Sequence, residues 1–235
     1  MDPYTYVNIF ETKGIEYLVI IAFLLLLIPF WILLNKKVRP VKVLKAIANL
    51  PSQVLRIPYG YFHTENLTWA HLEKSGAARV GLDDLLLQLT GNVGIKYLKE
   101  AEEEVRKGDP IIQVIQNGKH LDIKAPVSGQ LLGTNPLLAD SPELLNNDPY
   151  GEGWICRIKP SDWKAETGSY FLADEAVQWL KGEMQKVRDF IAMRAEKYTP
   201  GFSPAILQDG GELHSNLLSE MPDEIWSDFQ KEFLD

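Results

Sequence analysis

The chain contains a single cysteine, Cys156, and four histidines among its 235 residues. One cysteine excludes an intrachain disulfide framework and fits a reducing compartment. Its neighbours in the stretch 154–158 form an apolar, strand-like run, which favours a buried, inert thiol over a reactive one. The histidines, at positions 63, 71, 120 and 214, lack the short spacings of metal ligands, so the sequence predicts no metal site.

Basic charge is also scarce, because 24 Lys and Arg residues stand against 32 Asp and Glu residues and leave a net charge of −8. A nucleic-acid partner is not expected, since phosphate contacts need clustered Lys and Arg. The chain has no glycine-rich phosphate loop and no nucleophile elbow. The acidic run between Glu100 and Glu104 is interpreted as a solvated loop, because carboxylates catalyse only where a pocket shifts their pKa values. No catalytic residue and no small-molecule substrate are predicted.

One long apolar run is present near the N-terminus. From Tyr17 to Leu34 there are eighteen residues without a charge, about enough to cross ~30 Å of hydrocarbon. A cleaved signal peptide would have a basic segment before a shorter apolar core, but here Asp2, Glu11 and Glu16 come first. A buried helix of a soluble domain is the remaining alternative, and Pro29 could kink either kind of helix. We predict a retained transmembrane helix over residues 15–35.

The charges that flank this run predict its orientation. Five basic residues follow it within a short distance, namely Lys36, Lys37, Arg39, Lys42 and Lys45. Only Lys13 precedes it. Because basic flanks stay on the cytoplasmic side, we expect a single-pass protein of the cytoplasmic membrane. Its N-terminus would lie outside and its C-terminal domain in the cytoplasm.

The composition divides the chain into six segments. We expect an external segment at 1–14, the transmembrane helix at 15–35, a basic connector at 36–59, a globular domain at 60–172, an amphipathic helix at 173–197 and an extended tail at 198–235. Within the globular part, short β-branched and apolar runs are broken by Gly, Asn and Pro, which indicates a mainly-β domain. In the amphipathic helix, apolar residues recur every three or four positions, at Val177, Leu180, Met184, Val187 and Ile191.

A tight hairpin is indicated at Asn117 and Gly118. These two residues lie between apolar-alternating runs, and a type I′ turn requires a positive φ at both of its central residues. The turn predicts the cross-strand pairs Gln116–Lys119, Ile115–His120, Val114–Leu121, Gln113–Asp122, Ile112–Ile123 and Ile111–Lys124. This register gathers apolar pairs on one face, and a slip of one residue would bury polar side chains instead.

Two motifs near the hairpin carry a family resemblance. One is Ala-Pro-Val-Ser-Gly at 125–129, and the other is Asn-Asn-Asp-Pro-Tyr-Gly-Glu-Gly-Trp at 146–154. Both closely resemble motifs of the glycine-cleavage H protein. The chain resembles that family, almost without a gap, from Trp69 to Trp154. The resemblance implies a lipoyl-like barrel-sandwich hybrid, a mainly-β (α+β) fold. It also implies that the motif at 146–154 is a structural turn.

The resemblance places the family's lipoyl-carrying lysine in the turn of this hairpin, where the present chain has Gly118. The neighbouring residue is Lys119. Successive strand residues point to opposite faces, so a shift of one position redirects the side chain by about half a turn. We therefore predict that no cofactor is carried. The alternative is that lipoate is attached to Lys119.

The tail ends in a short amphipathic pattern after Pro222, which suits the first position of a helix. Its large apolar residues are Ile225, Trp226, Phe229 and Phe233. A helix this short is not stable alone in water, so these side chains need a docking surface. We expect them to dock on another protein subunit, as amphipathic anchors do. The alternative is that the tail folds back on the chain's own domain.

These features give three hypotheses about function. We favour a non-catalytic accessory subunit of a membrane-bound complex, with redox complexes among the options. The alternative is a membrane-tethered lipoyl carrier of the H-protein type that shuttles an intermediate on Lys119. A membrane-fusion or efflux adaptor is less consistent, because it should place the domain outside the cytoplasm and carry long coiled-coil arms, and the chain has no heptad run.

Overall fold

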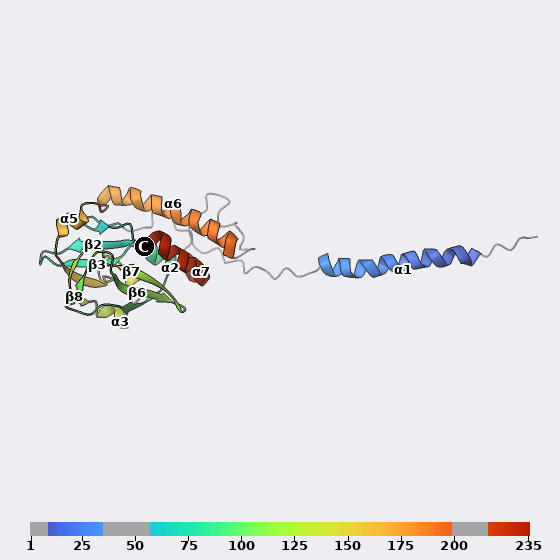
Figure 1. Ribbon diagram of the computed structural model, residues 1–235, viewed down its shortest axis with the longest axis horizontal. Helices are drawn as coiled ribbons and strands as arrows, with labels where there is room; N and C mark the ends of the chain where they lie inside the picture. The colour runs from blue at the N-terminus through green and yellow to red at the C-terminus, as the bar shows by residue number, and fades with distance from the viewer. Residues whose placement is uncertain (1–8, 35–56, 199–215) are drawn as a thin grey trace, which may run out of the picture. The chain divides into compact units, whose positions relative to one another are not determined.

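The computed structural model describes residues 9–34, 57–198 and 216–235 (Figure 1). The chain divides into two compact units, Met1–Val43 and Leu44–Asp235. The predicted external segment at 1–14 and the basic connector at 36–59 fall largely outside the described residues.

The described residues of the first unit form one helix, α1 (Ile9–Leu34), with Pro29 inside it. A helix is therefore present where the apolar run predicts one, and it begins several residues earlier than expected. All its described side chains, at positions 17–31, are exposed. No helix in the described part of the chain combines the length and the apolar character needed to span a bilayer, so the structure does not support the predicted transmembrane helix.

The second unit is mainly β where the structure describes it, at 57–198 and 216–235, and its strands form two antiparallel sheets there. The six-stranded sheet has the order β1 (Phe62–His63), β2 (Thr68–Leu72), β3 (Ala78–Leu82), β9 (Cys156–Pro160), β8 (Gly129–Thr134), β5 (Glu104–Val105). The three-stranded sheet has the order β4 (Gly94–Tyr97), β6 (Pro110–Gln116), β7 (Lys119–Lys124). This confirms the expectation of a mainly-β domain with accompanying helices.

Helices cover the sheets and connect the strands. They are α2 (Asp84–Thr90), α3 (Leu137–Asp140), α4 (Leu144–Asn147), α5 (Trp163–Thr167), α6 (Ala173–Tyr198), the 3₁₀ helix η2 (Leu217–Glu220), α7 (Asp223–Phe229) and the π-helical turn η3 (Gln230–Leu234). The long helix α6 agrees with the helix predicted at 173–197. Leu180, Val187 and Ile191 of its apolar stripe are buried, while Val177 and Met184 are half-buried.

Strand β8 contains two glycines in similar backbone conformations but different surroundings. Gly129 has a φ of +152° and lies where β8 pairs with Pro160 of β9. Gly133 has a φ of +158° and follows a register irregularity after Leu131. An ideal Cβ at position 129 would lie 2.8 Å from the carbonyl carbon of Lys159, whereas one at position 133 would meet nothing within 4 Å. The first glycine therefore permits a close approach of two backbones.

Candidate functional site

The hairpin between β6 and β7 contains the turn that the sequence predicts. Asn117 has a φ of +50° and Gly118 a φ of +82°, as a type I′ turn requires at both central positions. Five predicted pairs are confirmed, namely Gln116–Lys119, Ile115–His120, Val114–Leu121, Gln113–Asp122 and Ile112–Ile123. The local chemistry of Asn-Gly has therefore set both the turn and the register that follows from it.

The sixth predicted pair, Ile111 with Lys124, is wrong. Lys124 pairs with Pro110 instead, and the register shifts between Pro110 and Ile112. A bulge of this kind places one extra residue on one strand, so two successive side chains need not point to opposite faces. Ile111 and Ile112 are accordingly both buried, with exposed fractions of 1% and 0%. Strict alternation would have left one of them on the solvent side.

Position 118 is open. Gly118 is exposed, and an ideal Cβ there would have no heavy atom within 4 Å. A longer side chain would thus find space, at the cost of the left-handed backbone conformation that favours glycine. Glycine, however, supplies no amine. The turn itself therefore has no group to which an acyl chain could be attached.

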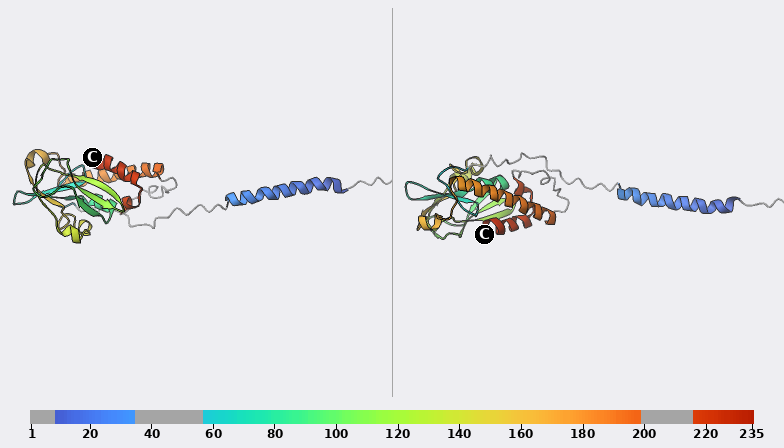
Figure 2. Two further views of the ribbon diagram at one scale, coloured as in Figure 1. Left: turned by 60° about the horizontal axis from the view of Figure 1, so that its bottom comes forward. Right: turned by 90° about the horizontal axis from the view of Figure 1, so that it is seen from above.

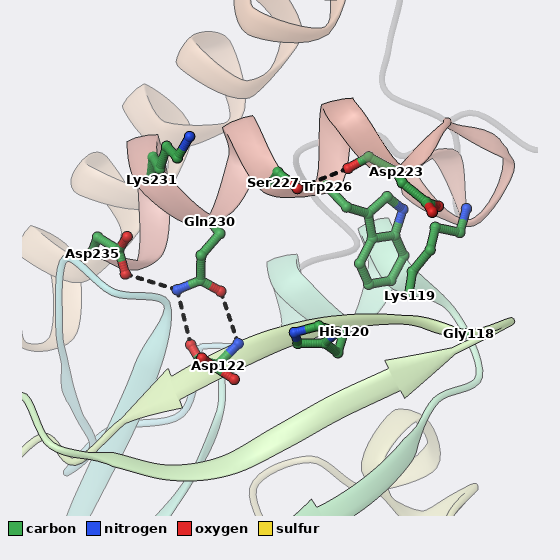
Figure 3. A pocket seen from close by; sticks show the side chains of 10 residues that line it. All are labelled: Gly118, Lys119, His120, Asp122, Asp223, Trp226, Ser227, Gln230, Lys231 and Asp235. Carbon is green, nitrogen blue, oxygen red and sulfur yellow. Dashed lines mark hydrogen bonds between the residues drawn. The ribbon is translucent and has the colours of Figure 1, made fainter.

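Lys119 has a side-chain amine, but this amine is already bonded to another part of the chain. Its Nζ donates hydrogen bonds to the backbone oxygens of Ser219, at 3.1 Å, and Met221, at 2.5 Å. The same Nζ lies 5.2 Å from the centroid of the Trp226 ring, within reach of a cation–π interaction. Figure 3 shows the lysine extending from the hairpin toward this indole. Burial lowers the pKa of Lys119 below its usual value, and the carboxylate of Asp223 partly opposes this shift.

The groups that hold Lys119 belong to the C-terminal segment, by which we mean residues 216–235. Its anchor residues have exposed fractions of 0% for Ile225, 2% for Trp226, 0% for Phe229 and 6% for Phe233. The indole N–H of Trp226 donates to the oxygen of Leu218 at 2.6 Å. The predicted amphipathic helix is present, beginning one residue later than expected, at Asp223. Its apolar side chains pack on the chain's own domain, so the structure does not meet the expectation that they dock on another subunit.

The C-terminal segment also bonds to the backbone of β7. The side-chain amide of Gln230 accepts a hydrogen bond from the Asp122 N–H at 2.8 Å and donates one to the Asp122 oxygen at 3.2 Å (Figure 3). Further along the strand, Lys124 forms an ion pair with Asp235, with 3.1 Å between Nζ and Oδ1. These contacts extend the attachment from the turn to the far end of β7.

On its other side the C-terminal segment packs against α6. Two views show α6 and α7 side by side (Figure 2). The rings of Phe229 and Phe233 lie 6.0 and 5.4 Å from the ring of Phe190, both edge to face. Arg194 reaches the carboxylates of Asp228, at 3.2 Å, and Glu232, at 3.6 Å. The segment is therefore held between the hairpin and the long helix. Nothing in the sequence pattern indicated these partners.

A groove of about 350 Å³ remains between β7 and the C-terminal segment. Its lining mixes positive, negative and aromatic side chains, including Lys119, His120, Asp122, Asp223, Trp226 and Lys231. Among the residues that the structure describes, no three His, Cys, Asp or Glu side chains gather in a way that could hold a metal ion. Cys156 is buried, as predicted, and burial raises the pKa of its thiol to about 12.

Comparison with known proteins connects this hairpin to a family. The family model described as glycine cleavage H-protein matches residues 60–183, just over half of the chain. A probable glycine cleavage system H protein of Pyrococcus horikoshii is 33% identical over 126 residues, which are 54% of this chain and 93% of the relative. One of Aeropyrum pernix is 44% identical over 101 residues, which are 43% of this chain and 69% of the relative.

A crystal structure of a glycine cleavage system H protein from Mycobacterium marinum is also similar. It has a TM-score of 0.47 and 26% identity, and it covers 54% of this chain and 99% of that chain. The family match contains both sheets and the whole β6–β7 hairpin, and it ends inside α6, before the C-terminal segment. The family match spans more than half of this chain, and the alignment with the P. horikoshii protein covers 93% of that relative. The chain therefore belongs to the glycine cleavage H-protein family.

Proposed function

We propose that this chain is a non-catalytic accessory subunit of a membrane-bound protein complex, and that its H-protein domain serves for binding instead of carrying lipoate. The observation that carries the proposal is the pair of residues at the hairpin turn. Gly118 occupies the position that family resemblance gives to the carrier lysine, and it has no amine. The adjacent Lys119 is bound by the chain's own C-terminal segment.

The contacts of Lys119 argue against its use as a carrier. Attaching lipoate would turn the ammonium group into an amide, which removes its charge and two of its three donors. The bonds to the oxygens of Ser219 and Met221 and the contact with the Trp226 ring depend on that charge and those donors. Each hydrogen bond from a charged donor contributes about 1.5–3 kcal/mol. Modification would therefore work against the packing of the C-terminal segment.

One observation favours the alternative, a lipoyl carrier that uses Lys119. Only a neutral amine can be acylated, and the lowered pKa of Lys119 increases the neutral fraction at a given pH. This shift has burial as its largest cause, so it depends on the same packing that restricts access to the group. The carrier function would require the C-terminal segment to move away, which would also remove the cause of the shift.

The absence of a lipoyl group is the first testable prediction. Intact-mass spectrometry of the protein isolated from its own host is expected to give the mass of the unmodified chain, because Gly118 supplies no amine. An H protein with an intact carrier lysine, expressed in the same cells, is the positive control for lipoylation. The matched variant is Lys119→Arg, which keeps the charge. An added lipoyl mass that disappears in Lys119→Arg would establish the carrier function instead.

The membrane setting of the complex is supported by the composition of the first unit. Every described side chain of α1, from position 17 to 31, is exposed, and large apolar residues occur all around this helix. A helix that is apolar on all sides is normally covered by lipid or by other protein. No helix in the described residues meets the length and apolar character of a bilayer span. The proposal therefore rests on the sequence: the uncharged run from Tyr17 to Leu34 and the five basic residues that follow it favour lipid, with the N-terminus outside and the second unit in the cytoplasm.

This topology can be tested with sealed vesicles. Protease added to right-side-out vesicles is expected to leave the second unit intact, because the membrane would shield it. The same protease added after permeabilisation with detergent is the control, and it should reach the exposed loops of the β domain. Digestion of the β domain in sealed vesicles would reverse the proposed orientation, and recovery of the chain in the soluble fraction would exclude the membrane setting.

A further inference from the structure

We propose that the C-terminal segment is a reversible cover of the β6–β7 hairpin, which opens while the rest of the β domain stays folded, and that Lys119 is the residue that holds it closed. The first observation is that the segment is an addition to the family's domain. The family match ends at residue 183, and a relative aligned over 93% of its own length is covered by 126 residues of this chain. The fold of the relatives is thus complete without this segment.

The second observation is the position of the segment on the hairpin. Its contacts run along one strand, from Lys119 beside the turn, through Asp122, to Lys124 at the other end. The segment therefore covers β7, the edge strand of the smaller sheet. In the closed state the C-terminal segment occupies the surface next to Gly118. Gly118 lines the same groove as Asp223 and Trp226 of that segment.

The third observation is the kind of contact that Lys119 makes. Its two acceptors belong to residues at and just after the end of η2 (Leu217–Glu220), where the last carbonyls of a helix have no partner within the helix. The hydrogen bonds from Lys119 satisfy carbonyls that would otherwise lose water on burial. The contact with Trp226 adds a second attachment beside the first. One side chain of the hairpin thus holds both the turn before α7 and the principal aromatic anchor.

A second lysine in the groove, Lys231, differs from Lys119 in its position. Lys231 lines the same groove but is exposed and lies on the C-terminal segment itself. Removing its ammonium group leaves the hydrogen bonds from Lys119 to Ser219 and Met221 in place. Lys231→Met is therefore a matched control for Lys119→Met, since both changes remove one ammonium group from the groove and leave a linear apolar side chain.

Such a cover would limit access to the hairpin. A partner that binds next to Gly118 could do so only in the open state, so its apparent affinity would be reduced by the fraction of molecules that are open. This inference does not depend on whether Lys119 ever carries lipoate. It concerns only the equilibrium between the closed and the open state of the C-terminal segment.

Native-state hydrogen exchange of the full-length protein tests the proposal. The protein is kept in mild detergent because of its apolar helix α1, and exchange is followed in peptides from residues 217–234 and from β2 and β3. In the unmodified protein, the segment is expected to exchange at least about tenfold faster than the β2–β3 core, as a locally opening unit does. In Lys119→Met, exchange of the segment should rise by a further factor of about ten or more, because two hydrogen bonds are lost. Exchange of the core should change by less than about twofold in this variant.

Two results would overturn the proposal. Equal protection of the segment and the core in the unmodified protein would make the segment a fixed part of the fold. Equal effects of Lys119→Met and Lys231→Met on the segment would show that Lys119 does not hold it. If Lys119→Met does not fold, Gln230→Ala replaces it, because this change removes the bonds to Asp122 from the segment's side. The comparison of exchange between the segment and the β2–β3 core in the unmodified protein decides whether opening occurs, whichever variant is used.

Discussion

Replacing Gly129 by alanine is expected to lower the free energy of unfolding by about 4 kcal/mol or more, with loss of the folded domain as the extreme result. The new Cβ would lie 2.8 Å from the carbonyl carbon of Lys159 and 2.9 Å from Cα of Pro160, and closer still to the Lys159 oxygen. These are backbone atoms of the paired strand β9, so they cannot turn away as a side chain could. Relief would require separating β8 from β9 in the middle of the larger sheet.

The same substitution at Gly133 is the matched control. Gly133 lies on the same strand with nearly the same φ, but a Cβ there would meet nothing within 4 Å. Its cost should be limited to the backbone strain of about 1–3 kcal/mol. Urea denaturation followed by circular dichroism would give both values. A difference of less than about 1 kcal/mol between the two variants would mean that β8 and β9 do not approach each other as described.

Truncation of Trp226 is expected to have the second largest effect. Trp226 is 2% exposed, donates to the oxygen of Leu218 and lies under the ammonium group of Lys119. Truncating a buried aromatic side chain to alanine costs about 3–5 kcal/mol. We therefore expect Trp226→Ala to lower the free energy of opening of the C-terminal segment by about this amount. Hydrogen exchange of residues 217–234 would measure this free energy.

Trp226→Phe separates packing from hydrogen bonding at the same site. It keeps a ring in the core but removes the indole N–H, leaving the Leu218 oxygen without this donor. The expected loss is about 1–3 kcal/mol, smaller than for alanine. If Trp226→Ala costs less than about 1 kcal/mol, the C-terminal segment is not packed on the domain, and the expectation of docking on another subunit would be restored.

The hairpin could be predicted from the sequence because its determinants are local. Asn117 and Gly118 meet a backbone requirement within two residues, and the register of the strands follows from the turn. The bulge between Pro110 and Ile112 was missed, because nothing in the alternation of residues shows where an extra residue enters a strand. The family assignment likewise rested on short, distinctive stretches around positions 125–129 and 146–154.

The C-terminal segment shows the limit of such reasoning. Its helix and its four buried anchors were visible as an amphipathic pattern, since that pattern is local as well. Its docking site was not, because Lys119 and the Met221 oxygen are separated by 102 positions in the sequence. A pattern of apolar residues states that a surface is needed but does not state which one. Here the chain's own hairpin and helix α6 supply it together.

The pairing of Gln230 with β7 has a further consequence for solubility. β7 is an outer strand of its sheet, and such a strand offers free N–H and C=O groups to any extended chain that comes near. The Gln230 amide binds both backbone groups of Asp122 and so imitates one residue of a neighbouring strand. While this amide is in place, β7 cannot be extended by another chain at that point. A molecule whose C-terminal segment has detached would therefore expose a template for edge-to-edge aggregation, and the open state would be tolerated only at low population or when a partner covers the strand.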